Sequence, residues 1–302
     1  MEYVVTTSNL TRKFGEFTAV KDLTINIKRG EIYGFLGPNG SGKSTTIRML
    51  CGILEPTSGS GSVLGYDLAR DPERIKKKIG YMSQKFSLYD DLTVYENLNF
   101  YSGLYGIPRR EKTGRINEMI AMAGLTGREK ELTANLGGGL RQRLALGCAI
   151  ISRPAILFLD EPTSGVSPSS RRMFFKIIRD LSREGTTVMV TTHFMDEAER
   201  CHNIAFISSG QLIANDTPGN LKRNVITGCM VEMEIDDPLN HIQHLESLPF
   251  VRECSVHGAA LHILLDSRDK ISSLEEFTGF PAVEITPTLE DVFISLSKAH
   301  RQ

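Results

Sequence analysis

A glycine-rich segment near the N-terminus, GPNGSGKST at residues 37–45, is the feature of this sequence that most limits its possible folds. It follows an apolar run, EIYGFL, that is typical of a buried strand, and it precedes TTIRMLCG, which has helical character. Strand, glycine-rich loop and helix, in this order, form the setting in which the pattern G-x-x-x-x-G-K-[ST] binds phosphate groups. The sequence therefore predicts a phosphate-binding loop in an α/β protein.

The residues of this loop have separate expected roles. Glycines let the backbone N–H groups turn inward around phosphate oxygens, and the following helix N-terminus adds partial positive charge. Lys43 is expected to reach the β- and γ-phosphates of a nucleotide, Ser44 to place its hydroxyl on Mg²⁺, and Thr45 to contact the α-phosphate. The expected nucleotide-binding residues of the loop are Gly37, Pro38, Asn39, Gly40, Ser41, Gly42, Lys43, Ser44 and Thr45.

Two carboxylates, Asp160 and Glu161, stand at the end of a second apolar run, ILFLD at 156–160. At such a strand end Asp160 is expected to hold Mg²⁺, and Glu161 to act as the general base toward an attacking water. An isolated Asp-Glu pair after a strand is usually a solvated loop, but the loop at 37–45 makes a shared site the better interpretation. His193, which ends the run TVMVTTH, is expected to contact a γ-phosphate, whereas a lone histidine is more often structural.

Apolar runs of strand length alternate with longer helical patterns, which is typical of an α/β architecture. Strand signals vanish between residues 90 and 150, so we expect an inserted helical subdomain at about 86–150 within a first domain at 1–222. Beyond it, short strands and helices follow the order βαββαβ plus a last helix. This order predicts a small α+β domain at 223–302, with a regulatory or dimerisation role.

Charge and composition exclude several classes of protein. Lys and Arg number 35 against 36 Asp and Glu, and this balance argues against a nucleic-acid partner. The sequence shows no run of 18 apolar residues and no secretory signal, so an intracellular protein that does not span a membrane is expected. Its five cysteines have no C-x-x-C spacing and are expected to be reduced thiols.

Taken in order, the motifs GPNGSGKST, YMSQ, R-Q-R after a glycine-rich helix start, LDEPTSG and TTH resemble the ATP-binding cassette (ABC) family. The resemblance covers about residues 1–222. It implies a P-loop NTPase cassette with an inserted helical subdomain, which binds ATP and Mg²⁺ and dimerises head to tail around two ATP molecules. It also implies that Gln84 contacts Mg²⁺ and the attacking water, and that Phe14 stacks on adenine.

The resemblance further implies a docking surface for a transmembrane subunit at 86–106. This segment is rich in aromatic residues, which would fit an ordinary core equally well. The aromatic residues are Phe86, Tyr89, Tyr95, Phe100, Tyr101 and Tyr105.

Two positions depart from the family pattern. The signature, usually Leu-Ser-Gly-Gly-Gln, is LGGGL at 136–140, so Gly137 lacks the serine hydroxyl that bonds the γ-phosphate of the opposite subunit's ATP, and Leu140 replaces Gln. Gly138 and Gly139 keep their backbone donors toward that nucleotide. Ser167 stands where the family prefers Asp. We expect ATP binding to be intact, and the rate of turnover stays open.

These features predict an ATP-binding and ATP-hydrolysing subunit that powers a separately encoded membrane permease. TPTLEDVFISLS at 286–297 resembles the C-terminal extension of drug-export and ABC-2-like ATPase subunits, which favours an exporter. The expected partners are that permease and a second nucleotide-binding subunit, in a homodimer or a heterodimer. The expected location is cytoplasmic and peripheral, on the inner face of the cell membrane. The alternatives are a regulatory cassette with weak hydrolysis and a soluble cassette ATPase not engaged in transport.

Overall fold

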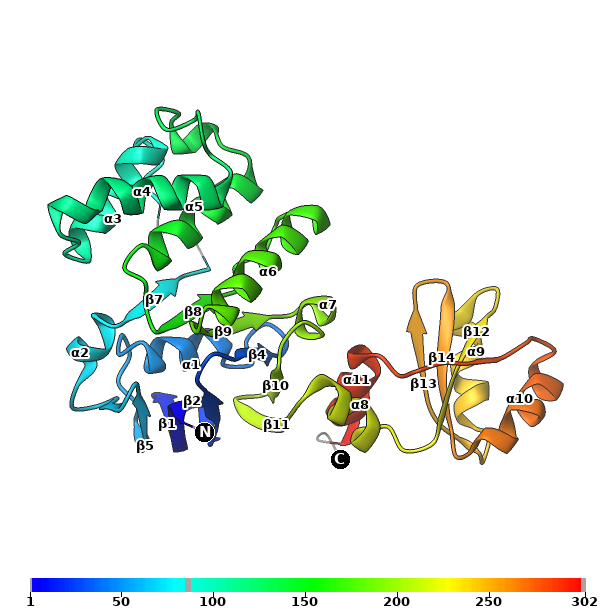
Figure 1. Cartoon of the computed structure of the whole chain (residues 1–302). Helices are drawn as coiled ribbons and strands as arrows, with labels where there is room; N and C mark the ends of the chain where they lie inside the picture. The colour runs from blue at the N-terminus through cyan, green and yellow to red at the C-terminus, as the bar shows by residue number, and fades with distance from the viewer. Residues whose placement is uncertain (1, 85–87, 300–302) are drawn as a thin grey trace. The chain divides into compact units, whose positions relative to one another are not determined.

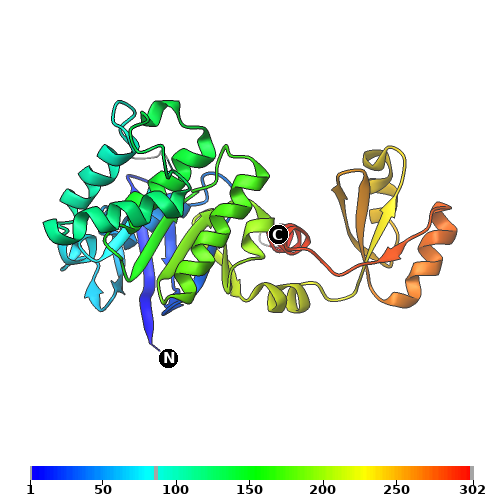
Figure 2. The same ribbon diagram turned by 45° about the horizontal axis from the view of Figure 1, so that its top comes forward.

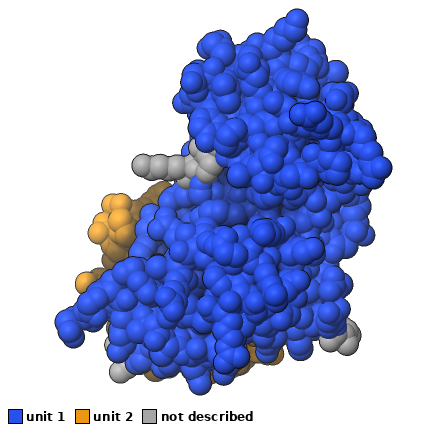
Figure 3. Space-filling model, turned by 90° about the vertical axis from the view of Figure 1, so that its left-hand side faces the viewer, with its two compact units in different colours: residues 1–212 blue, residues 213–302 orange. Residues whose placement is uncertain are grey.

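The computed structural model describes residues 2–84 and 88–299 (Figure 1). The chain divides into two compact units, Met1–Leu212 and Ile213–Gln302, which Figure 3 shows in separate colours. The division falls inside strand β11 (Gln211–Asp216). Each unit has its own hydrophobic core, so each is described separately.

A six-stranded sheet forms the centre of the first unit, with the strand order β11-β10-β4-β9-β8-β7. The strands from β10 to β7 run parallel, and all residues of β4, β8 and β9 are buried. Burial on both faces explains why these strands appear in the sequence as continuous apolar runs. Their bounds are β4 (Ile32–Leu36), β7 (Ile79–Met82), β8 (Ile156–Asp160), β9 (Thr187–Thr192) and β10 (Asn203–Ser208).

A second sheet in this unit is antiparallel and is built around the long strand β1. Its strands are β1 (Tyr3–Phe14), β2 (Phe17–Leu23), β3 (Asn26–Lys28), β5 (Ser58–Val63) and β6 (Tyr66–Asp67). The sequence SGSGSV of β5 has no apolar alternation, and Val63 is its one buried residue, so sequence patterning did not predict this strand. Helix α1 (Lys43–Leu50) packs against both sheets, and its Ile47 and Leu50 belong to the shared core.

Helices α3 (Val94–Leu104), α4 (Arg109–Ala123) and α5 (Gly138–Ile150) pack on one another. Figure 1 shows the three helices grouped together, Figure 2 gives a second view of them, and α5 contacts strand β7 of the parallel sheet. The remaining helical segments of the unit are α2 (Pro72–Lys76), the 3₁₀ turn η1 (Thr133–Asn135), α6 (Pro168–Arg183) and α7 (Met195–Ala198). Helix α6 packs against strands β4 and β9. Its residues Phe174, Phe175 and Ile178 are buried, and its other face is polar.

The second unit contains an antiparallel sheet with the order β13-β14-β12-β15. Val231, Ile263 and Leu274 are fully buried in its core. Its strands are β12 (Cys229–Glu234), β13 (Val251–His257), β14 (Ala260–Leu265) and β15 (Val283–Glu284). Its helical segments are α8 (Pro218–Val225), α9 (Pro238–Glu246), η2 (Arg268–Lys270), α10 (Ile271–Thr278) and α11 (Leu289–Ala299). The five cysteines of the chain are unpaired and buried, as the sequence predicted.

Candidate functional site

The glycine-rich loop connects the end of β4 to the start of α1, as the sequence predicted. Gly42 has φ 102°, a left-handed conformation that L side chains rarely adopt, and a Cβ there would lie 2.5 Å from the Ala19 carbonyl oxygen. A Cβ on Gly37 would lie 2.3 Å from the Ile207 carbonyl oxygen. Glycine is therefore required at both positions, because neighbouring strands press directly on the loop backbone.

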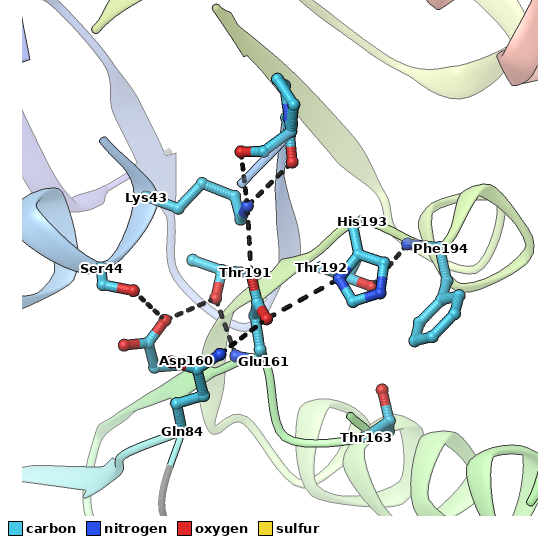
Figure 4. Close-up of polar contacts among 12 residues, drawn as sticks. Lys43, Ser44, Gln84, Asp160, Glu161, Thr163, Thr191, Thr192, His193 and Phe194 are labelled. Atoms are coloured by element: carbon cyan, nitrogen blue, oxygen red, sulfur yellow. Dashed lines mark hydrogen bonds and ion pairs between the residues drawn. The ribbon is translucent and has the colours of Figure 1, made fainter. Parts of the chain in front are cut away.

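Lys43 is buried at the start of α1, with 4% of the residue exposed. Its Nζ donates hydrogen bonds to the carbonyl oxygens of Gly37 (2.8 Å) and Pro38 (3.0 Å). It also lies 3.1 Å from Oε1 of Glu161 (Figure 4). A buried ammonium needs such compensation, and the contacts hold its charge inside the loop.

Asp160 ends strand β8, and its Oδ1 accepts hydrogen bonds from the hydroxyls of Ser44 and Thr191, both at 2.9 Å. Burial raises the pKa of the Asp160 carboxyl above its usual value, although these two hydrogen bonds act in the opposite direction. Thr191 also accepts a hydrogen bond from the backbone N–H of Glu161 at 2.8 Å. The sequence analysis missed Thr191, because only the register between β8 and β9 brings it opposite Asp160.

Glu161 lies at the centre of the polar contacts in Figure 4. Its φ of 46° is left-handed, which typically costs a non-glycine residue about 1–3 kcal/mol. Its Oε2 accepts a hydrogen bond from Nε2 of Gln84 at 3.1 Å and lies 3.7 Å from Nδ1 of His193. The structure thus brings together Lys43, Gln84, Glu161 and His193, four predicted site residues from separate segments of the chain.

A cavity of about 380 Å³ opens beside these residues. Phe14, Gln84 and Glu161 line it together with Phe17 and Ala19, which the sequence analysis missed. Phe14 and Phe17 are paired across the turn between β1 and β2, and the guanidinium of Arg12 lies 4.6 Å from the Phe14 ring centroid. The loop residues in the lining are Asn39, Gly40, Gly42, Lys43, Ser44 and Thr45.

The loop residues Gly37, Pro38 and Ser41 are not among the described residues that line this cavity. Gly37 and Pro38 instead provide the two carbonyls that hold Lys43. The hydroxyl of Ser41 is buried, and it has no hydrogen-bond partner within the described part of the chain.

Comparison with known proteins places this geometry in a family. Residues 20–164 match the family model described as "ABC transporter". The chain is 33% identical over 301 residues to the linearmycin resistance ATP-binding protein LnrL of Bacillus subtilis (strain 168), and the match covers 96% of each chain. The chain belongs to the ABC transporter family. As a member, it carries an ATP-binding cassette.

Other ABC relatives match over different lengths. The probable multidrug ABC transporter ATP-binding protein YbhF of Escherichia coli (strain K12) is 51% identical over 221 residues, which cover 73% of this chain. The match spans 38% of the length of that relative. The Nod factor export ATP-binding protein I of Rhizobium etli is 33% identical over 295 residues, covering 96% of this chain and 92% of its own.

Solved ABC structures share the fold of the first unit. CbiO1 from Clostridium perfringens, part of the cbiONQ transporter complex, has a TM-score of 0.68 at 27% identity and covers 74% of this chain and 92% of its own. The cassette MJ0796, solved as a dimer with ADP and Pi, has a TM-score of 0.64 at 28% identity, with coverages of 70% and 98%. These matches confirm the predicted α/β P-loop cassette.

The altered ABC signature lies at the start of α5, outside the described lining of the cavity. Gly137 is the N-cap residue, with φ −61° and ψ 151° and no side-chain cap. Nothing lies within 4 Å of a Cβ built on Gly137, whereas a Cβ on Gly139 would lie 2.4 Å from Oγ of Ser170. A side chain at Gly137 therefore meets open space, whereas a side chain at Gly139 requires Ser170 to shift.

A buried carboxylate that sequence reasoning missed connects the segments after β8 and β9. Glu197 accepts hydrogen bonds from the hydroxyls of Thr163 (2.5 Å) and Thr192 (2.6 Å). Burial raises the pKa of its carboxyl. These bonds join the loop that follows Glu161 to the strand end that carries His193. The second departure, Ser167, caps α6 and accepts a hydrogen bond from the N–H of Ser170.

The aromatic residues of the segment at 86–106 are only partly buried. Tyr89, Tyr95 and Phe100 are 45%, 37% and 42% exposed, and the rings of Tyr89 and Phe100 meet edge to face with centroids 4.9 Å apart. Phe86 lies outside the described residues. Across residues 2–84 and 88–299, no helix combines the length and the apolar character that crossing a bilayer requires.

Proposed function

We propose that this chain is the ATP-hydrolysing subunit of an exporter and acts on a separately encoded membrane permease. The observation that carries the proposal is the buried ion pair between Lys43 and Glu161 beside the Ser44–Asp160 pair, at the mouth of the glycine-rich loop. The loop provides phosphate donors, Glu161 provides a base, and the cavity beside them has an aromatic residue, Phe14, in its lining.

The residues present fit a nucleotide with Mg²⁺. Ser44 and Asp160 offer two hard oxygen atoms 2.9 Å apart, and the side-chain oxygen of Gln84 provides a third ligand in our proposal. Ser44, Asp160 and Gln84 would hold Mg²⁺, which would supply charge neutralisation on the phosphates. The burial that raises the pKa of Asp160 also supports a cation site, because a divalent cation compensates the buried charge.

In the structure the ammonium of Lys43 contacts Glu161. In the proposed mechanism, the phosphates of ATP replace Glu161 as the partner of this ammonium. This exchange frees Oε1 of Glu161 to accept a proton from the attacking water. As the water oxygen bonds to the γ-phosphorus, the bond to the bridging oxygen of ADP breaks. Gln84 positions the water through the amide that now contacts Oε2, and His193 contacts the γ-phosphate.

Export and the partners are supported by relatives. The names of the Rhizobium and Bacillus proteins refer to Nod factor export and linearmycin resistance, and the name of the Escherichia coli protein to multidrug transport.

In our proposal a second cassette subunit closes over the nucleotide through its residues 137–139. The permease docks on the exposed aromatic residues Tyr89, Tyr95 and Phe100, which places the chain on the inner face of the membrane. We assign a regulatory or dimerising role to residues 223–302.

Paired variants test the assignment of the catalytic site. Lys43→Ala should lose ATP binding, because it removes a buried ammonium that would face the phosphates. Glu161→Gln should keep ATP binding, form an ATP-bound dimer, and lose about 10²- to 10⁴-fold in phosphate release. The matched control is Glu55→Gln, at an exposed glutamate outside the cavity. Wild-type turnover by Glu161→Gln would assign the base to another residue.

Membrane recruitment tests the transport role. We expect the chain to fractionate with the membrane when it is co-expressed with the permease encoded beside its gene, and to stay soluble alone. A chain that stays soluble with every neighbouring membrane protein would contradict the transport role and favour a regulatory cassette. The open space at Gly137 is the observation that supports this second function, because the missing hydroxyl would slow hydrolysis.

A further inference from the structure

Two histidines and an aspartate of the second unit lie close together. Nδ1 of His262 lies 2.8 Å from Oδ1 of Asp291, and Nε2 of His257 lies 3.1 Å from the same oxygen. The three possible ligand atoms all lie within 4.8 Å of one another. His262 and Asp291 are buried, and His257 is largely buried. Three elements, β13, β14 and α11, provide one residue each.

His262 faces a carboxylate at each of its ring nitrogens. Its Nε2 lies 3.3 Å from Oε2 of Glu232, its cross-strand partner on β12. A neutral imidazole has a single N–H, so it can donate to only one of the two carboxylates. With the proton on Nε2, toward Glu232, the lone pair of Nδ1 points at Asp291. A carboxylate that orients a ligand histidine in this way is the usual second partner in protein metal sites.

Asp291 has one oxygen already occupied and one directed at the histidines. Its Oδ2 accepts hydrogen bonds from the N–H and the hydroxyl of Thr288, both at 2.7 Å, at the start of α11. Its Oδ1 faces Nδ1 of His262 and Nε2 of His257. With the proton on Nδ1 of His262 the 2.8 Å contact is a hydrogen bond, whereas with the proton on Nε2 two lone pairs face each other and a cation would bind both.

The ring of His257 provides the second, independent indication. Its Nε2 is buried and has no hydrogen-bond partner within the described residues, because its contact with Asp291 lacks hydrogen-bonding geometry. The ring stacks on that of His262 with centroids 3.7 Å apart and an interplanar angle of 9°. A buried imidazole nitrogen without a partner is costly, and a metal ion would satisfy it.

We infer that His257 Nε2, His262 Nδ1 and Asp291 Oδ1 form a binding site for a divalent transition metal of the Zn²⁺ class. Two imidazoles and a carboxylate suit this class, with water as the fourth ligand. Ligand atoms 2.0–2.2 Å from a tetrahedral metal lie about 3.3 Å apart. The contact between Asp291 and His262 is shorter, at 2.8 Å, and the 3.1 Å contact to His257 changes when the ring of His257 turns. The site ties the first turn of α11 to the hairpin of β13 and β14.

Binding requires one movement. A metal must lie in the plane of each imidazole, and the two stacked planes are nearly parallel, so the ring of His257 has to turn out of the stack. His257 is the last residue of β13, directly before the turn at Gly258, and its side chain is 13% exposed. Its position at the strand end permits this rotation, and the buried His262 stays in place.

Calorimetric titration of the full chain with Zn²⁺ alone, after removal of metals and without nucleotide, tests the site. We expect one Zn²⁺ per chain and an upward shift of the melting temperature on binding. His257→Asn should weaken binding by about 100-fold or more, and Glu232→Gln by roughly 10-fold through loss of the ring orientation. The matched control is His244→Asn, at an exposed histidine of α9 in the same unit.

Co²⁺ provides a second readout, because the intensity of its visible absorption distinguishes a tetrahedral site from the octahedral aqueous ion. The wild-type chain should give the absorption of a tetrahedral site, and folded His257→Asn should lose it. Two results would overturn the inference: no saturable Zn²⁺ binding by the wild-type chain, or equal affinity in His257→Asn and wild type. Neither result bears on the proposed ATPase activity, because the cluster and the nucleotide site have no residue in common.

Discussion

At the scale of single residues, a buried charge in the candidate site lowers the stability of the fold. Asp160 is buried, and its raised pKa means that the folded chain binds the proton of this carboxyl more tightly than the unfolded chain does. The protonated form therefore stabilises the fold below the unfolded pKa of about 3.9. That stabilisation is lost as the pH rises through the folded-state pKa. At neutral pH the ionised carboxylate destabilises the chain when no cation is bound.

Asp160→Asn should therefore raise the melting temperature of the metal-free chain at pH 7.5, and the gain should shrink toward pH 4. The amide oxygen can still accept the hydrogen bonds from Ser44 and Thr191. Thermal unfolding at both pH values, with Asp91→Asn at an exposed loop position as the control, measures the effect. Equal melting temperatures at pH 7.5 would contradict it. Mg²⁺-dependent phosphate release should be lost in the variant.

Gly137 is the second single residue whose substitution is expected to change activity. Gly137→Ser should raise the ATPase activity of the purified chain by roughly 10- to 100-fold, because a charge-assisted hydrogen bond of about 1.5–3 kcal/mol is restored across the dimer. The backbone of Gly137 and the space around it accept a serine, which also caps α5. Phosphate release measures the gain, and ATP affinity of the monomer should not change.

Gly114→Ser, in α4 with nothing near its Cβ, is the matched control for Gly137→Ser. Unchanged activity of Gly137→Ser with intact ATP-dependent dimerisation would mean that the glycine run already provides the γ-phosphate contacts.

At the scale of elements, one buried side-chain amide holds the segment that precedes α3 in place. Asn97 is fully buried; its Nδ2 donates to the carbonyl of Tyr89 at 3.0 Å and to the hydroxyl of Thr133 at 2.9 Å. Its Oδ1 accepts from the N–H of Tyr89 at 2.9 Å. The exposed ring of Tyr89 is therefore positioned by the interior of the helical group, and the proposed docking surface depends on this amide.

Asn97→Ala should destabilise the chain by roughly 1–3 kcal/mol, because the backbone N–H of Tyr89 and the hydroxyl of Thr133 each lose a hydrogen bond to the Asn97 amide. Urea unfolding measures the loss of stability. The control is Asn99→Ala, which lies two residues further along α3, on a different face of the helix, and is partly exposed. At temperatures where the variant stays folded, ATP affinity should match wild type and stimulation by the permease should fall. Wild-type stability would show that water replaces the amide without cost.

At the scale of the whole molecule, the two units differ in what they contribute. Every residue of the candidate nucleotide site lies in Met1–Leu212. Strand β10 pairs directly with β4, and the N–H of Gly210 donates to the carbonyl of Ser41 in the phosphate loop. Strand β10 and the turn at Gly210 are therefore part of the support of the loop.

A chain that ends at Asp216 keeps β11 whole and should fold and bind ATP with wild-type affinity. A chain that ends at His202 lacks β10 and should fail to fold, which makes it the negative control. Fluorescent nucleotide titration and circular dichroism distinguish the cases. Loss of ATP binding by the longer fragment would assign part of the nucleotide site to residues 217–302.

Much of the parallel sheet was predictable, because β4, β8 and β9 are buried on both faces and appear as short apolar runs between polar segments. Strand β5 was not predictable. It has a single buried residue, and it is a strand because β1 offers it backbone partners. The short helices α2 and α8 also lack a long apolar period, so the sequence did not reveal them.

The phosphate loop was predictable from local sequence, since its glycines stand between a strand and a helix that adjoin it in the chain. The position of Asp160 and Glu161 at a strand end was predictable for the same reason. Tertiary packing was needed to bring Thr191 to Asp160, Gln84 and His193 to Glu161, and His257 and His262 to Asp291. These contacts depend on strand order and register, which arise from packing between distant segments and leave no local pattern in the chain.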